Sequence, residues 1–120
     1  MFIKHFDKKI RRHRRVSLNI RGNGQRPRIA LHRSGRYIYA QAIDDDKRMT
    51  LAAFSSLKLR REKAYQKTKK SDEARLVGQR LAALLQGKKI SRAVFDRAGY
   101  PYLGRVKSVA EGIREGKVQI

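Results

Sequence analysis

Cysteine is absent from this chain of 120 residues, and acidic residues are few. Without cysteine the chain can form neither disulfides nor a cysteine-based zinc site, so its stability has to come from packing and from a partner. Only 10 Asp and Glu residues stand against 31 Lys and Arg residues, which gives a formal net charge of +21. So many like charges repel one another unless an acidic partner compensates them. A polyanion is therefore the expected partner.

Long hydrophobic runs are also missing from the sequence. No stretch approaches the length of a transmembrane helix, and there is no amphipathic helix with large apolar residues of the kind that binds a lipid surface. The basic N-terminus lacks the apolar run and the small-residue cleavage site of a secretory signal. These absences disfavour a membrane partner and predict a cytoplasmic protein that binds nucleic acid.

The positive charge is concentrated in two blocks. Residues 1–36 contain 12 Lys and Arg residues and one acid, and residues 57–70 contain seven basic residues and one acid. Residues 1–25 have few apolar side chains and two glycines, so we interpret them as a basic tail that is disordered or ordered by RNA. Hydrophobic residues make up 40% of the chain. We therefore expect residues 26–120 to form a single α/β RNA-binding domain.

Hydrophobic spacing predicts an α/β fold for this domain. Extended patterns cover residues 28–31, 37–43, 50–54, 90–95 and 117–120. Helical spacing follows Ser71, which we interpret as an N-cap, and continues to Gly87; a second helical pattern covers residues 106–113. The short loops between the first three strands favour an antiparallel meander, and the later strands, separated by helices, are expected to be parallel. The prediction is a mixed sheet of about five strands packed with two main helices.

The stretch RSGRYIYAQ, residues 33–41, combines a turn with an amphipathic strand. Side chains alternate along a strand, so Tyr37, Tyr39 and Gln41 share one face while the small and aliphatic residues between them share the other. Tyrosine rings beside Arg33 and Arg36 suit base stacking and phosphate contact. An ordinary half-exposed edge strand would show the same pattern, and the stretch alone does not separate the two interpretations.

The stretch DRAGYPYLGRVK, residues 96–107, is a second candidate for RNA contact. Its glycines allow close approach of the backbone, its tyrosines offer rings, and its basic residues lie near the start of a helix, where phosphate is favoured. Neither the Walker pattern nor the Rossmann glycine spacing is present, so this is no nucleotide loop. Tyrosines that pack on the sheet are the structural alternative, and we expect at least one to be partly structural.

Enzymatic alternatives have weak support in the sequence. Asp44, Asp45 and Asp46 could suggest a divalent metal site, but consecutive strand residues point to opposite faces and a solvated turn fits better. His5, His13 and His32 show no metal-ligand spacing, and no serine lies in a nucleophile elbow. We therefore expect no catalytic residue, metal, cofactor or small-molecule substrate. A general nucleic-acid chaperone and a metal-dependent nuclease remain as alternatives.

Three motifs occur in order: RPRIALHRSGRYIYAQAIDDD, TLAAFSS and VFDRAGYPYLGRVKSVAEGIREG. Together they resemble the bacterial form of ribosomal protein eighteen of the large subunit, over roughly residues 11–120. The resemblance implies a protein of the large ribosomal subunit that binds 5S rRNA and helps attach it to the large-subunit rRNA in the central protuberance, beside other ribosomal proteins. It also implies a ribonuclease-H-like arrangement and a basic N-terminal extension along RNA.

The family's RNA-facing turn and strand fall on Arg33, Ser34, Tyr37, Tyr39 and Gln41, and its loop pattern on Gly99, Tyr100, Tyr102, Gly104 and Arg105. Two positions depart from the pattern: Leu103 replaces a common His, and Tyr37 stands where His is frequent. With the basic residues, the expected RNA-binding set is Arg11, Arg12, Arg14, Arg15, Arg21, Arg26, Arg28, Arg33, Ser34, Arg36, Tyr37, Tyr39, Gln41, Arg97, Gly99, Tyr100, Tyr102, Gly104, Arg105 and Lys107.

Overall fold

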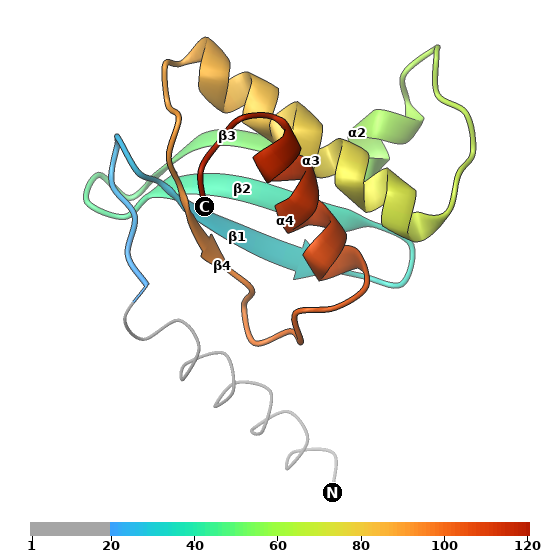
Figure 1. Ribbon diagram of the computed structural model, residues 1–120, viewed down its shortest axis with the longest axis horizontal. Helices are drawn as coiled ribbons and strands as arrows, with labels where there is room; N and C mark the ends of the chain where they lie inside the picture. The colour runs from blue at the N-terminus through green and yellow to red at the C-terminus, as the bar shows by residue number, and fades with distance from the viewer. Residues whose placement is uncertain (1–19) are drawn as a thin grey trace, which may run out of the picture.

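The structure, a computed structural model, describes residues 20–120. Most of the expected basic tail, including Arg11, Arg12, Arg14 and Arg15, lies outside the described residues. Within them the elements follow in the order β1, β2, β3, α2, α3, β4 and α4 (Figure 1).

An antiparallel meander forms the first half of the sheet, as expected. Strand β1 spans Arg28–Arg33, β2 spans Ile38–Asp44 and β3 spans Met49–Ser55. Both neighbouring pairs are antiparallel, and the β2–β3 register shifts between Ala42 and Ile43. Short loops join these strands, and adjacent strands joined in this way pair antiparallel.

The fourth strand completes a mixed sheet with the order β3-β2-β1-β4. Strand β4, Val94–Asp96, pairs parallel with β1 but is shorter than the expected strand over residues 90–95. The expected fifth strand at residues 117–120 is wrong: Gln119 makes a single parallel bridge with Arg92. Lys117 has a φ of 69°, a left-handed conformation that cannot continue an extended strand. The described sheet therefore has four strands, and the ribonuclease-H-like arrangement stays a prediction.

Two long helices were expected, and both are present. Helix α3 spans Lys70–Gly87 and α4 spans Arg105–Glu115. The expected N-cap at Ser71 is wrong, because Lys69 already holds the extended cap conformation and its carbonyl accepts from the Glu73 N–H at 2.9 Å. A short helix, α2, Ser56–Arg60, was not anticipated; the Ser55 hydroxyl caps it by accepting from the Lys58 N–H at 3.2 Å.

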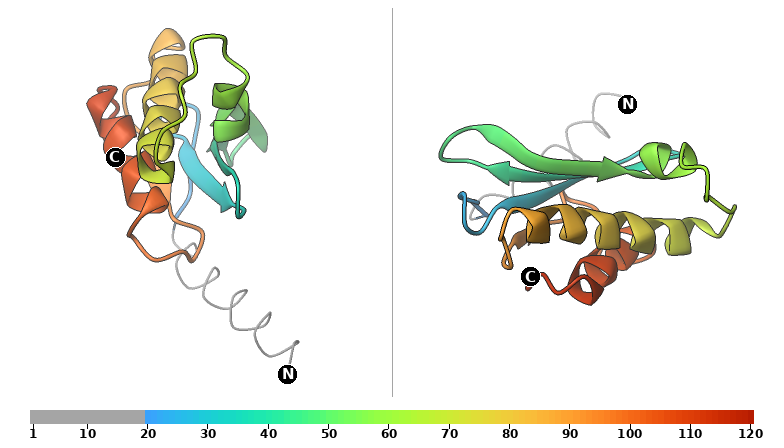
Figure 2. Two further views of the ribbon diagram at one scale, coloured as in Figure 1. Left: turned by 90° about the vertical axis from the view of Figure 1, so that its right-hand side faces the viewer. Right: turned by 90° about the horizontal axis from the view of Figure 1, so that it is seen from above.

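Helices α3 and α4 lie on the same side of the sheet and leave its other face without a described helix (Figure 2). Buried side chains between the layers include Ile29, Leu31, Ile38, Ala40, Ala42, Val77, Leu81, Leu85, Val106, Val109 and Ile113. The two helices approach closely at Gly78 and Gly112. A Cβ built on Gly112 would lie 2.0 Å from the Arg75 carbonyl oxygen, so only glycine allows this packing.

Candidate nucleic-acid interface

The open face of the sheet carries the aromatic side chains that strand alternation predicted. Tyr37 and Tyr39 are half-buried and Gln41 is exposed, whereas Ile38 and the two alanines of β2 are buried in the core. This confirms the expected division of faces along β2. Aromatic surface and amide groups therefore remain accessible on a face that no described helix covers.

A row of aromatic rings crosses this face. His32 of β1 lies opposite Tyr39 of β2, and their ring centroids are 5.8 Å apart. The Tyr37 ring meets the Tyr39 ring edge to face at 6.4 Å. Rings arranged in this way offer apolar surfaces and polar tips on which unpaired bases can stack.

The turn after β1 and the loop before α4 meet in space. Arg105 Nη2 donates to the Ser34 carbonyl oxygen at 3.0 Å, and the Arg33 N–H donates to the Tyr100 hydroxyl at 3.3 Å. The Arg33 guanidinium also lies over the Tyr100 ring, 4.8 Å from its centroid. The two stretches that the sequence singled out are thus joined directly.

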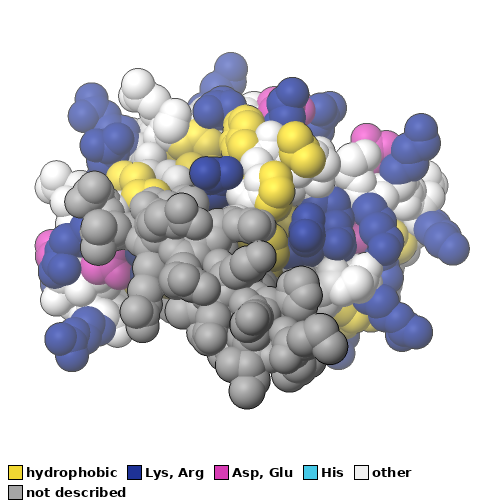
Figure 3. Space-filling view, turned by 90° about the horizontal axis from the view of Figure 1, so that it is seen from below, with side chains coloured by type: hydrophobic (Ala, Val, Ile, Leu, Met, Phe, Trp, Pro, Cys, Tyr) yellow, Lys and Arg dark blue, Asp and Glu magenta, His cyan; other side chains and the backbone are white. Residues whose placement is uncertain are grey.

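This junction is electropositive. Within the described residues no carboxylate forms a salt bridge with Arg33, Arg36 or Arg105. Burial lowers the pKa of the Arg105 guanidinium, and the nearby positive charge of Arg33 lowers it further. Two guanidinium groups held close together without a salt-bridge partner favour binding of an anion between or beside them. The face in Figure 3 likewise shows many more Lys and Arg than Asp and Glu side chains.

The 96–107 loop is shaped by left-handed backbone and by its own side chains. Gly99 and Gly104 have φ values of 82° and 58°. Arg97 Nη1 donates to the Tyr100 carbonyl oxygen at 3.2 Å, and the Tyr102 hydroxyl accepts from Arg114 Nη1 at 3.0 Å. Both tyrosines therefore make contacts within the domain, which agrees with the expectation that at least one is partly structural. Leu103, at the position where the resemblance implies a histidine, is 66% exposed.

Three of the expected RNA-binding arginines lie away from this junction, near the β2–β3 turn or the start of β1. Arg21 Nη2 binds Asp46 at 2.8 Å, and Arg28 binds Asp45 through Nε and Nη2, each at 3.0 Å. Arg26 is exposed. The charges of Arg21 and Arg28 are thus partly compensated inside the domain. Lys107 lies on α4, where its Nζ is 4.0 Å from Glu111 Oε1.

The three aspartates at this turn form no simple solvated turn. Asp44 is 2% exposed, and its Oδ1 accepts from the N–H groups of Asp46 and Lys47 at 3.0 and 3.2 Å. The hydrogen bond from Arg28 lowers the pKa of Asp45, and the Gly22 N–H donates to the same carboxylate at 2.8 Å. Each carboxylate therefore serves the turn or an arginine, and no described group of three side chains forms a candidate metal site.

Sequence reasoning missed three residues at the junction. His32 was weighed as a metal ligand and not as the cross-strand neighbour of Tyr39. The side chains of Arg60 and Lys70 donate to the carbonyl oxygens of Arg36 and Gly35, at 3.3 and 2.7 Å. The charge block at residues 57–70 was visible in the sequence, but nothing local linked it to the turn.

Comparison with known proteins agrees with these features. Residues 3–120 match the family described as ribosomal L18 of archaea, bacteria, mitochondria and chloroplasts. The chain is 43% identical over 113 residues to the large ribosomal subunit protein uL18 of Oleidesulfovibrio alaskensis, covering 94% of each chain. It is 46% identical over 107 residues to that of Clostridioides difficile, covering 89% of this chain and 88% of the relative. The chain therefore belongs to the L18 family of large-subunit ribosomal proteins.

Proposed function

We propose that this protein binds 5S rRNA and helps attach it to the large-subunit rRNA in the central protuberance. The observation that carries the proposal is the junction between the 34–37 turn and the 96–107 loop, where Arg105 reaches Ser34 and Arg33 lies over Tyr100. At this junction, arginines that form no salt bridge with any described carboxylate lie beside aromatic rings, next to the open sheet face. This combination suits RNA.

Membership of the L18 family gives the general role of the protein. The protein is a structural, non-enzymatic constituent of the large ribosomal subunit in the cytoplasm, and its partners are rRNA and other ribosomal proteins. Within the described residues no helix is long and apolar enough to cross a membrane. The choice of 5S rRNA, and of neighbouring proteins in the central protuberance, belongs to the proposal.

Recognition is expected to use backbone geometry and unpaired bases. The deep, narrow major groove of an RNA duplex hides its base edges, so side chains contact phosphates, 2′-hydroxyls and unstacked nucleotides instead. In this proposal Arg33, Arg36 and Arg105 contact phosphates, while Tyr39 and Gln41 face bases. The basic residues 1–25 act as a tail that adds contacts of little sequence preference.

A filter-binding titration against purified 5S rRNA tests the proposal. If about 6 to 10 phosphates are contacted, affinity should fall by orders of magnitude over a modest increase in salt, by analogy with counterion release from DNA. The same protein should prefer 5S rRNA to an unrelated structured RNA and to duplex DNA. Equal affinity for all three would favour a general nucleic-acid chaperone and overturn the proposal.

Two substitutions test the site itself. Arg33→Ala and Tyr39→Ala should each reduce the preference for 5S rRNA over competitor RNA, because they remove groups that face the RNA. Arg92→Ala is the charge-matched control, since Arg92 is exposed and lies outside the junction. Tyr39→Phe keeps the ring and should retain most of the preference if stacking dominates. If these substitutions weakened the binding of 5S rRNA and of the competitor RNA equally, the role of Arg33 and Tyr39 in recognising 5S rRNA would be contradicted.

A further inference from the structure

Residues 58–70, here called the basic segment, carry cations that the domain itself does not neutralise. Lys58, Arg61, Lys63, Lys67 and Lys69 are exposed, and no described carboxylate forms a salt bridge with them. The one acid of the segment, Glu62, pairs with Arg80 of α3 through Arg80 Nη1 at 2.5 Å. The remaining charges face solvent, where a polyanion can reach them.

A buried carboxylate fastens this segment to the domain. Glu73 of α3 is 3% exposed and accepts hydrogen bonds from Arg60 Nε and Nη2, each at 3.0 Å, and from the Tyr65 hydroxyl at 2.5 Å. Burial raises the pKa of the Glu73 carboxyl, but the hydrogen bonds from Arg60 and Tyr65 lower it more, so its pKa lies below the usual value. The carboxylate is therefore ionised at neutral pH and holds two points of the segment.

The same arginine links the basic segment to the 34–37 turn. Arg60 Nη2 donates to the Arg36 carbonyl oxygen at 3.3 Å, and its guanidinium lies over the Tyr37 ring, 5.0 Å from the centroid. At the far end of the segment, Lys70 Nζ donates to the Gly35 carbonyl oxygen at 2.7 Å. With Arg105 on the Ser34 carbonyl oxygen at 3.0 Å, cations from three helices bind three consecutive carbonyl groups of one turn.

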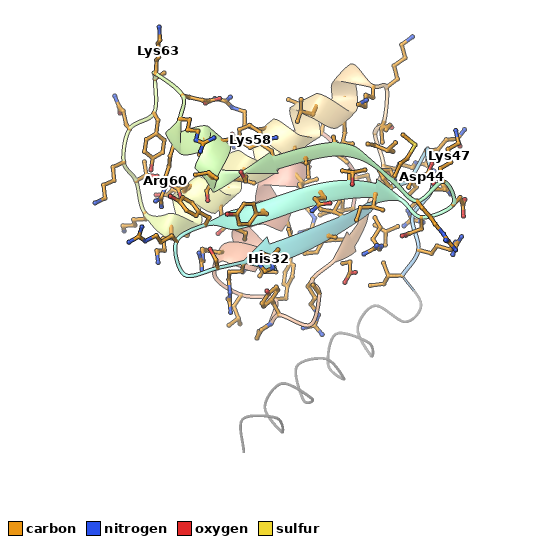
Figure 4. All side chains as sticks on the ribbon, turned by 180° about the vertical axis from the view of Figure 1, so that it is seen from behind. His32, Asp44, Lys47, Lys58, Arg60 and Lys63 are labelled. Carbon is orange, nitrogen blue, oxygen red and sulfur yellow. The ribbon has the colours of Figure 1, made fainter. Side chains whose placement is uncertain are left out.

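These contacts place the basic segment and the turn at one end of the sheet. Figure 4 shows Lys58, Arg60 and Lys63 there, and Asp44 and Lys47 at the other end. A negative charge at Glu73 weakens the attraction of this end for RNA, since it opposes the surrounding cations. The favourable effect of Glu73 is therefore structural. Its carboxylate fixes the positions of Arg60 and Tyr65, and these two residues hold the basic segment in place.

We infer that the basic segment is a second RNA-contacting surface, continuous with the 34–37 turn, and that Glu73 is the positioning residue that holds it there. The ligand is the sugar-phosphate backbone of RNA, which lysine ammonium groups contact as point charges without reading sequence. This inference rests on the proposed function, because it assumes that the turn faces RNA.

The surface is tested by neutralising two of its lysines. Lys63→Gln with Lys67→Gln should weaken binding of 5S rRNA about tenfold and lower the salt slope by about 1 to 2, because two phosphate contacts are lost. The matched control is Lys47→Gln with Lys88→Gln, which removes the same charge from exposed positions outside the segment. The control pair should lose no more than about threefold, from long-range attraction alone.

The positioning role is tested by Glu73→Gln beside Asp72→Asn, its exposed neighbour on α3. Both substitutions remove one negative charge, so electrostatics alone predicts slightly tighter RNA binding for each. We expect Asp72→Asn to bind as tightly as the native chain or more tightly, and Glu73→Gln to bind several-fold more weakly at a temperature where circular dichroism shows it folded. The weakening should largely disappear when Lys63 and Lys67 are already Gln, which a purely structural defect would not produce.

The outcomes separate this inference from the proposed function. If the native chain prefers 5S rRNA but both lysine pairs lose equal affinity, the basic segment is no RNA surface and the proposed function stands. If Glu73→Gln binds as tightly as Asp72→Asn, the positioning role is wrong. If the native chain itself shows no preference for 5S rRNA, the proposed function fails first.

Discussion

Arg105 and Ser34 are 71 positions apart in the chain, yet Arg105 Nη2 donates to the Ser34 carbonyl oxygen at 3.0 Å. This contact joins the start of α4 to the turn between β1 and β2. It places the cation of one candidate stretch beside the backbone of the other.

Replacing Arg105 should disrupt both the charge and the shape of the junction. Arg105→Ala should weaken 5S rRNA binding about tenfold or more, because it removes a half-buried cation and frees the turn. Arg92→Ala is the matched control, since it removes an exposed arginine that lies outside the junction. Isothermal titration calorimetry of both variants with 5S rRNA measures the two affinities. Equal losses of affinity would show that only the charge matters and not the position of Arg105.

Two deletions separate the role of the N-terminal residues in RNA binding from their role in the domain. Removal of residues 1–19 should lower affinity for any RNA and flatten the salt dependence without reducing the free energy of unfolding. Removal of residues 1–24 also breaks two hydrogen bonds between Gly22 and Asp45, one between backbone groups and one to the Asp45 carboxylate, as well as the Arg21–Asp46 pair. It should cost about 1 to 3 kcal/mol of stability as well. Urea unfolding of both truncated proteins measures the difference in their free energies of unfolding. Identical unfolding midpoints would contradict the predicted loss of stability.

The close packing of α3 against α4 requires glycine at position 112. Gly112→Ala should destabilise the domain by about 1 to 3 kcal/mol, because its Cβ would lie 2.0 Å from the Arg75 carbonyl oxygen. Gly87→Ala, at the end of α3, meets nothing within 4 Å and should leave stability unchanged or raise it by up to about 1 kcal/mol. Thermal and urea unfolding measure the stability of both variants. Similar losses of stability in the two would mean that the clash between α3 and α4 does not cause the destabilisation.

Acid should weaken the domain partly through Glu73. Its pKa is lowered on folding from an ordinary value of 4.5, so the unfolded chain binds the proton more readily. The stabilising contribution is therefore fully present above the unfolded pKa and is lost as pH falls through the lowered folded pKa. Urea unfolding between about pH 7 and pH 3 should show a smaller acid-dependent loss for Glu73→Gln than for the native chain. Parallel curves for the two proteins would exclude this contribution.

Much of the fold follows from local patterns. Alternation in residues 37–42 predicts the buried and open faces of β2, because neighbouring strand residues point in opposite directions. Three- and four-residue spacing predicts α3 and α4. The helix start at Ser71 and the strand at residues 117–120 were wrong, because local patterns do not reveal the extended Lys69 or the left-handed φ of Lys117.

The sequence by itself determined the excess of positive charge, the open aromatic face of β2 and the two stretches suited to RNA. Only the tertiary structure decided how they combine. Arg105 reaches Ser34, and Glu73 holds Arg60 near Tyr37, across separations that no local spacing reports. The tertiary structure also decided that the carboxylates of Asp45 and Asp46 pair with the charges of Arg28 and Arg21. The physical reason is that charge is fixed by composition, whereas the pairing of charges depends on contacts that form only when the sheet and helices pack.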